Sequence, residues 1–176
     1  MILTRRRLME AGGGIFAALA VGPAAARASD LVDIAMLGKA DGSHVWFDPV
    51  GIHLQPGQTA RWTNRNPGNS HTVTSYHPEI FGRPQRIPDG AKPWNSDYLL
   101  PNESFSRTFA VEGVYDYYCV PHEHAGMVGR IVVGAPAAVD AGGGTPEAGL
   151  TPLPEAALNG FPPVEEIIAR GVVHGS

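Results

Sequence analysis

The amino-acid sequence predicts an all-β domain built as a β-sandwich of short strands. Between Ser29 and Val133, segments rich in β-forming residues alternate with turn signals, which is typical of a two-sheet sandwich. The 176 residues include 22 glycines and 16 prolines, a content that favours a loop-rich β domain over a helical bundle. No segment of this range keeps a helical period for more than about two turns. The length suits one domain with extensions.

The expected strands follow one another at short intervals along the chain. Several begin or end at a turn signal, such as Asp48-Pro49, Pro56-Gly57 or Pro101-Asn102. Gly126 and Gly129 permit a tight return into the last strand. The strands are expected at residues 32–36, 45–47, 59–64, 71–74, 104–110, 113–119 and 130–133.

A long proline-rich stretch from Tyr76 to Leu99 interrupts this pattern. A loop of this length is uncommon unless it has a purpose or local structure of its own. It starts shortly after His71, so we expect it to lie over the same end of the sandwich as that residue.

The composition changes again from Gly134 onward. Residues 135–176 form a tail rich in alanine, proline and glycine, and residues 140–146 resemble a flexible linker. A short helix is expected near the end, with Pro162-Pro163 at its start and Val164, Ile167 and Ile168 on one face. The alternatives are a partly ordered tail and a helix that docks on the sandwich or on a partner.

Residues 1–28 resemble an export signal. Arg5 and Arg6 lie in the paired-arginine motif of a twin-arginine signal, a short apolar stretch follows, and Ala26-Arg27-Ala28 supplies a cleavage site before Ser29. The alternative is an uncleaved membrane anchor, but the apolar stretch is shorter than the roughly 20 residues of a spanning helix. We therefore expect the mature domain, residues 29–134 with its tail, in the periplasm or another extracytoplasmic space.

Charge narrows the choice of partners. The whole chain has a formal net charge of −4, and removal of residues 1–28, with four arginines and one glutamate, changes it to −7. An acidic mature protein is not expected to bind nucleic acid or an anionic membrane. The charge is compatible with steering toward a basic protein partner.

The chain's single cysteine, Cys119, opens a loop with the spacing of a metal site. A lone thiol in an oxidising compartment is expected to be buried or bound to a metal. His122 follows three residues later and Met127 five residues after that, so one loop presents a thiolate, an imidazole and a thioether. These soft and borderline ligands suit both oxidation states of copper.

A second histidine is needed, and His71 is the natural candidate. It begins an expected strand that can end beside the last hairpin of the sandwich. Singly, each of these residue types has a simpler interpretation, as packing or as a surface side chain. Together, His71, Cys119, His122 and Met127 predict a trigonal His₂Cys site with a weak axial methionine. His124 is interpreted as a solvated loop histidine, although it could compete for the metal. His77 could lie near the site but belongs to no motif, and His44, His53 and His174 are interpreted as surface residues.

Strand alternation also predicts the direction of the side chains before Cys119. Tyr115 and Tyr117 should point inward with Cys119, and Asp116 and Tyr118 should point outward. Tyr118 is then either a contact point for a partner or an ordinary exposed tyrosine.

Residues from about Val45 to Val133 resemble the plastocyanin and halocyanin group of cupredoxins, the type 1 blue-copper proteins. The matching segments are Pro56-Gly57 with Arg61-Trp62-Thr63-Asn64, His71-Thr72-Val73-Thr74, Ser104-Phe105, Gly113 to Cys119, His122, Gly126-Met127 and Gly129 to Val133. Thr72 stands where plastocyanins have asparagine, the stretch from Tyr76 to Leu99 is longer than the family resemblance leads us to expect, and the tail after Gly134 is additional.

The resemblance implies a Greek-key sandwich holding one copper ion. It also implies single-electron transfer between redox proteins, such as a cytochrome, an oxidase or a reductase, with His122 as the exposed electron port. We expect a monomer without enzymatic activity. A copper storage or delivery module is the main alternative; a zinc hydrolase or a copper oxidase is disfavoured, because methionine is a poor zinc ligand and further histidine clusters are missing.

Overall fold

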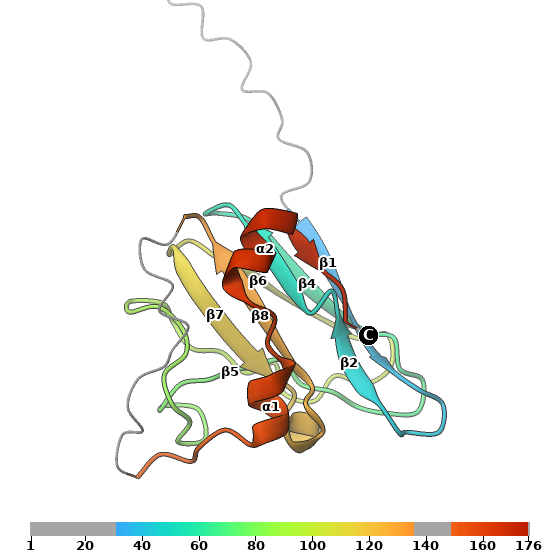
Figure 1. The fold of residues 1–176 in the computed structure, drawn as a ribbon. Coiled ribbons are helices and arrows are strands. Elements are labelled where there is room, and N and C mark those ends of the chain that lie inside the picture. The colour runs from blue at the N-terminus through green and yellow to red at the C-terminus, as the bar shows by residue number, and fades with distance from the viewer. Residues whose placement is uncertain (1–30, 136–148, 176) are drawn as a thin grey trace, which may run out of the picture.

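The computed structural model describes residues 31–135 and 149–175, which form a two-sheet β-sandwich with two short helices (Figure 1). The first sheet has the order β2-β1-β4-β6 and the second the order β5-β7-β8-β3-β9. The β1–β4 and β3–β8 pairs are parallel, and the remaining pairs are antiparallel. The bounds are β1 Leu31–Gly38, β2 Val45–Asp48, β3 Gly51–Leu54, β4 Thr59–Asn64, β5 Thr74–Ser75, β6 Ser104–Thr108, β7 Gly113–Tyr118, β8 Val128–Val133 and β9 Val172–Val173.

The predicted all-β sandwich is therefore confirmed, with differences in its strands. The segment expected at residues 71–74 contributes only the short strand β5, and His71 forms an isolated bridge with Leu99 instead. Strands β3 and β9 were not predicted from the sequence. β9 has only two residues, too few for a periodic pattern to be recognised.

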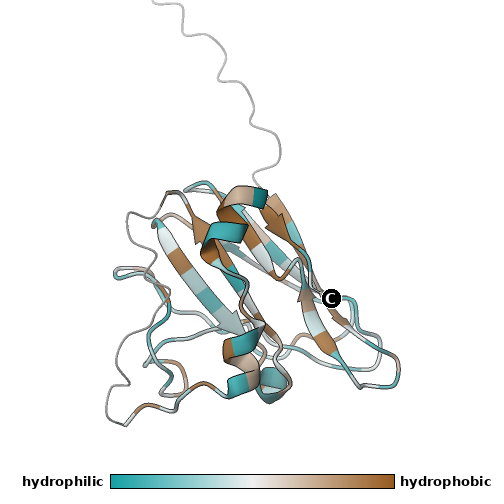
Figure 2. Ribbon diagram, viewed as in Figure 1, coloured by the Kyte–Doolittle hydropathy of each residue, from teal (hydrophilic) through white to brown (hydrophobic). Residues whose placement is uncertain are grey.

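An aromatic core fills the space between the two sheets. Trp62 of β4 meets Tyr117 of β7 edge-on at 5.3 Å between ring centroids, and Phe47 of β2 meets the same tyrosine at 4.9 Å. All three side chains are fully buried. Hydrophobic and hydrophilic residues alternate along the strands that enclose this core (Figure 2), so the strand periodicity directs one face of each sheet inward.

The C-terminal segment, residues 149–175, covers the outer face of the second sheet (Figure 1). It contains helices α1 Glu155–Gly160 and α2 Val164–Arg170 and ends in β9, which pairs with β3. Val164 and Ile167 pack against Val132 of β8. Ile168 was expected on the same face but is 42% exposed. The expected short helix is present as α2, and of the two alternatives the structure shows a helix docked on the sandwich, with a second helix and a strand beside it.

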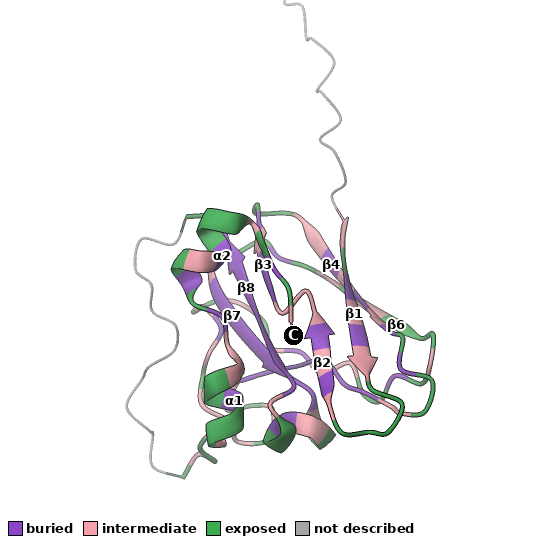
Figure 3. Ribbon diagram, turned by 45° about the vertical axis from the view of Figure 1, so that its right-hand side comes forward, coloured by how far each residue is buried: buried purple, intermediate pink, exposed green. Residues whose placement is uncertain are grey.

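Because both faces of the second sheet are covered, β7 and β8 are buried almost along their whole length (Figure 3). The inward direction of Tyr115, Tyr117 and Cys119 is confirmed, since all three belong to the central core. The expected exposure of Asp116 and Tyr118 is wrong, because they are 0% and 1% exposed. Their side chains point away from that core, but the segment from Tyr76 to Leu99 and the C-terminal segment lie over them.

Tyr118 stacks on Tyr76 with 4.3 Å between ring centroids. Asp116 accepts hydrogen bonds from Arg130 of β8 and from Arg86 of the proline-rich stretch, at 2.7 and 2.8 Å. Tyr118 is therefore not available as a surface contact for a partner.

Two of the sequence predictions concern residues outside this description. The export signal of residues 1–28 and the linker of residues 140–146 both lie there. Within the described ranges, no helix has the length and apolar character needed to cross a membrane.

Candidate metal centre

His71 reaches the site from the edge of the second sheet. Its backbone pairs with Leu99, with hydrogen bonds of 3.2 and 2.8 Å. Its imidazole is fully buried, and Nε2 lies 3.1 Å from Oδ1 of Asn66. The amide oxygen can only accept, so Nε2 carries the proton and Nδ1 presents its lone pair toward Cys119.

Cys119 directly follows β7 and is fully buried. Its Sγ lies 3.6 Å from Nδ1 of His71 and 3.3 Å from Nδ1 of His122. The backbone N–H of Thr72 donates to the same sulfur at 3.3 Å. A sulfur that accepts a backbone hydrogen bond and faces two imidazole nitrogens is placed to act as a metal ligand in its thiolate form.

The ligand loop, Cys119 to Met127, is closed by its own backbone. It contains the 3₁₀ turn η1 Val120–Ala125 and ends at Gly126, whose φ of 80° favours glycine. The N–H of Cys119 donates to the carbonyl of Met127 at 3.0 Å, and the N–H of Met127 donates to the carbonyl of His122 at 3.1 Å. These hydrogen bonds hold the backbone of Met127 beside Cys119 and His122, and the side chain of Met127 is fully buried.

His122 is the least enclosed of the four residues. Its ring is half-buried and lies 4.9 Å from the ring of His71 between centroids. The side-chain amide of Asn69 lies 3.2 Å from Nε2, on the far side of the ring from the cysteine. His122 thus connects the buried cluster with the molecular surface.

Thr72 connects the ligand loop to the segment that contains His71. Its Oγ1 accepts a hydrogen bond from the N–H of Val120 at 2.8 Å and lies 3.1 Å from Oγ1 of Thr74. The threonine side chain therefore ties the start of the ligand loop to the strand that follows His71. This contact supplies a brace at the position where plastocyanins have asparagine.

Burial sets the proton affinities of the cluster. Burial and, secondarily, the charge of His122 lower the pKa of His71 to about 4, and burial also lowers the pKa of His122. Burial raises the pKa of Cys119 to about 11, against the opposing effect of hydrogen bonds from Thr72. At neutral pH the two imidazoles are therefore neutral and ready to bind a cation, and a bound metal must displace the thiol proton.

Three of the four predicted residues form a metal-sized cluster. Ligand atoms of His71, Cys119 and His122 all lie within 4.8 Å of one another, and no other group of three or more His, Cys, Asp or Glu side chains in residues 31–135 and 149–175 is arranged in this way. Met127 adds a buried thioether in the same loop. A thiol, two imidazoles and a thioether form the donor set that fits copper.

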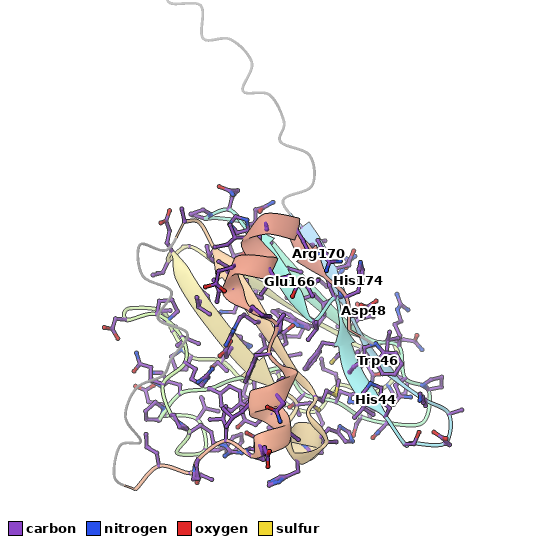
Figure 4. The ribbon with its side chains drawn as sticks, in the orientation of Figure 1. His44, Trp46, Asp48, Glu166, Arg170 and His174 are labelled. Carbon is purple, nitrogen blue, oxygen red and sulfur yellow. The ribbon has the colours of Figure 1, made fainter. Side chains whose placement is uncertain are left out.

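The remaining histidines lie apart from this cluster. His124 is exposed although it lies between two members of the ligand loop. His53 Nε2 is 2.7 Å from the carbonyl oxygen of Gly134, so it is half-buried rather than a surface residue. His44 is half-buried and stacks on Trp46 of β2, and the exposed His174 hydrogen-bonds to Asp48 at 2.9 Å (Figure 4). His77 is half-buried, and its Nδ1 accepts a hydrogen bond from the N–H of Glu79 at 3.2 Å.

Sequence reasoning missed the residues that support the cluster. Asn66 holds His71, and Glu123 lies buried inside the ligand loop, where its carboxylate contacts Tyr76 and Arg83. Asn66 lies in a turn-rich loop and Glu123 next to a predicted ligand, which are the available signals in the sequence. Neither signal indicates burial, because the covering segments come from distant parts of the chain.

A β-sandwich that gathers Cys, two His and a buried Met at one end defines a mononuclear copper protein. Comparison with known proteins agrees. The profile of copper binding proteins of the plastocyanin/azurin family matches residues 34–134. The chain belongs to this family, and copper is its cofactor.

Individual relatives support the assignment. The chain is 36% identical over 126 residues to the chloroplastic plastocyanin of Fritillaria agrestis, covering 70% of this chain and 72% of the relative. It is 34% identical over 105 residues to the plastocyanin of Scenedesmus fuscus, covering 57% of this chain and 99% of the relative. Among solved structures, a pseudoazurin from Sinorhizobium matches with a TM-score of 0.55 and 30% identity, covering 79% of this chain and 94% of that one.

Proposed function

We propose that this protein is an exported blue-copper electron carrier that shuttles single electrons between redox proteins. Family membership supports the coarser statement that it is a copper-binding electron-transfer protein. The observation that carries the proposal is the convergence of Cys119 Sγ with Nδ1 of both histidines, at 3.6 and 3.3 Å. We propose His71, Cys119, His122 and Met127 as the four copper ligands.

The protein's contribution is to hold these ligands still. When bound there, copper supplies a one-electron Cu(II)/Cu(I) couple. Asn66 fixes the ring of His71, Thr72 braces the ligand loop, and the backbone of Met127 closes it. A site with ligands fixed by such outer contacts changes little between oxidation states, which favours rapid electron exchange.

His122 is proposed as the electron port. The side chain of His122 is half-buried, whereas the side chains of the other three proposed ligands are fully buried. Pro121 next to it is exposed, and Leu100 is 58% exposed one residue after the backbone partner of His71. Because Pro121 and Leu100 are exposed apolar side chains close in sequence to His122 and to the backbone partner of His71, we propose them as contacts for a redox partner such as a cytochrome, an oxidase or a reductase. We propose that the carrier acts as a monomer and catalyses no reaction of its own.

We also propose export through residues 1–28, with the mature protein in the periplasm or another extracytoplasmic space. Support comes from the paired arginines and the short apolar stretch. Cell fractionation of the full chain with Arg5→Lys and Arg6→Lys together tests this step. The double variant should stay inside the cytoplasm as an uncleaved precursor, and its normal export would contradict the proposal.

Visible and electron paramagnetic resonance spectra of the copper-loaded protein test the electron-carrier function. The oxidised protein should be intensely blue and should lose its colour on reduction, because the thiolate of Cys119 dominates the colour of such a site. Cys119→Ser should abolish the colour. A colourless copper-loaded protein would contradict the proposal. Rapid loss of copper to an acceptor, without electron exchange, would instead favour storage or delivery.

A further inference from the structure

Glu123 is a buried carboxylate in the middle of the ligand loop. Its residue is 1% exposed, and acidic side chains are almost never buried to this extent unless they are paired. Its Oε2 forms an ion pair with Arg83, and its Oε1 accepts a hydrogen bond from the hydroxyl of Tyr76 at 2.9 Å. Removing two charges from water is costly. The close partners of both charges offset this cost, which is why the ion pair can be buried.

The position of Glu123 along the loop connects it to the proposed ligands. It directly follows His122, whose carbonyl accepts the N–H of Met127 at 3.1 Å. Its own carbonyl accepts the N–H of Gly126 at 2.9 Å. An anchored Glu123 side chain therefore fixes the backbone between the second histidine and the methionine.

Arg83 joins this point to two other parts of the chain. It belongs to the proline-rich stretch from Tyr76 to Leu99, and its guanidinium lies 5.4 Å from the ring centroid of Tyr118. It also donates to the carbonyl of Pro152 in the C-terminal segment at 3.1 Å. Its side chain is 11% exposed. The proline-rich stretch, the C-terminal segment and the ligand loop thus meet at one buried guanidinium.

We propose that Glu123 and Arg83 are positioning residues of the copper centre, whose ion pair fixes the ligand loop and balances charge beside His122. The inference rests on the proposed copper function. Charges in a poorly solvated region act strongly on a nearby metal ion. A negative charge favours Cu(II), a positive charge favours Cu(I), and the intact pair nearly cancels both effects.

The reduction potential of the copper protein separates this charge balance from simple structural support. Glu123→Gln leaves Arg83 uncompensated, so the potential should rise. Arg83→Gln leaves Glu123 uncompensated, so the potential should fall. The double variant should return toward the wild-type value. A purely structural role predicts instead that both single variants loosen the loop and shift the potential in the same direction, and that result would overturn the proposal.

A matched control is available on α2. Glu166 pairs with Arg170 at 2.6 Å on the exposed surface, away from the ligand loop (Figure 4). Glu166→Gln removes the same kind of charge from the same kind of pair, and the potential and the visible spectrum should not change. Equal shifts in Glu166→Gln and Glu123→Gln would show that only net charge matters, which would also overturn the proposal.

Two milder variants keep the test valid if Glu123→Gln does not fold. Tyr76→Phe removes only the hydroxyl that binds Glu123, and Arg83→Lys keeps the charge but loses the planar fork. Both variants should release copper to a chelator several-fold faster than the wild type. Arg83→Lys should keep a reduction potential close to that of the wild type, because the positive charge is retained. Unchanged release in both variants would contradict positioning. A wild-type protein that is not blue would instead refute the copper function itself, so the two failures are distinguishable.

Discussion

Thr72 shows how one residue can support a metal site without touching the metal. Its hydroxyl accepts the N–H of Val120, and its backbone N–H reaches the sulfur of Cys119. Thr72→Val keeps the size and the backbone contact but leaves the half-buried N–H of Val120 without its acceptor. We expect a loss of about 1–3 kcal/mol in the free energy of unfolding. Urea denaturation of the metal-free protein measures it.

Thr72→Ser is the control for that prediction, because it keeps the hydroxyl. It should lose clearly less stability than Thr72→Val. Equal losses in the two variants would mean that the methyl group contributes as much as the hydrogen bond, and a smaller loss in Thr72→Val than in Thr72→Ser would contradict the prediction.

His71 gives the metal-free protein a pH dependence. Its pKa is lowered to about 4 in the folded protein, mainly by burial, against an ordinary value of 6.5. Between these values the unfolded chain binds more protons than the folded one, so stability falls as the pH falls from about 6.5 toward 4. Urea denaturation at pH 7 and pH 5 should show a smaller decrease for His71→Gln than for the wild type. Identical decreases would show that His71 is not the source.

The C-terminal segment illustrates packing at the scale of an element. Its second helix, α2, has one buried face toward β8 and β3, although the helix is only seven residues long. Such a short helix is not stable alone and depends on the sheet beneath it. Close contact is possible because β3 begins with Gly51, where an added Cβ would lie 2.8 Å from the side chain of Ile167.

Ile167 and Ile168 make a matched pair for testing this packing. Ile167→Ala should lower the free energy of unfolding by about 2–5 kcal/mol, since Ile167 is fully buried. Ile168→Ala should change it by no more than about 0.5 kcal/mol, since Ile168 is 42% exposed. Chemical denaturation of both variants measures the difference, and similar losses would mean that α2 does not dock as described.

On the scale of the whole molecule, the second sheet is covered on both faces, and this changes what the surface can do. In an uncovered sandwich, Tyr118 would face water and offer a second approach to the copper end. Here Tyr76, Arg83 and the C-terminal segment cover it. Electron exchange should therefore depend on His122.

The sequence by itself determined the chemistry of the site and the class of fold. Cys119, His122 and Met127 lie within one loop, so their spacing could be recognised without any knowledge of distant contacts. Strand alternation correctly directed Tyr115 and Tyr117 into the core, because the side-chain period of a strand is a local property. Prolines and acidic residues in the right order also predicted the helix after residue 163.

Only the tertiary structure decided how closely the distant His71 approaches the ligand loop, which distant residues support the site and which faces are covered. His71 meets Cys119 across 48 positions of sequence, and Glu123 meets Tyr76 across 47. Strand alternation predicts the side of a sheet on which a residue lies, but it does not show whether another segment lies over that side. The burial of Tyr118 and of the Glu123–Arg83 pair therefore follows from how the proline-rich stretch and the C-terminal segment pack, since burial depends on contacts between segments rather than on local pattern.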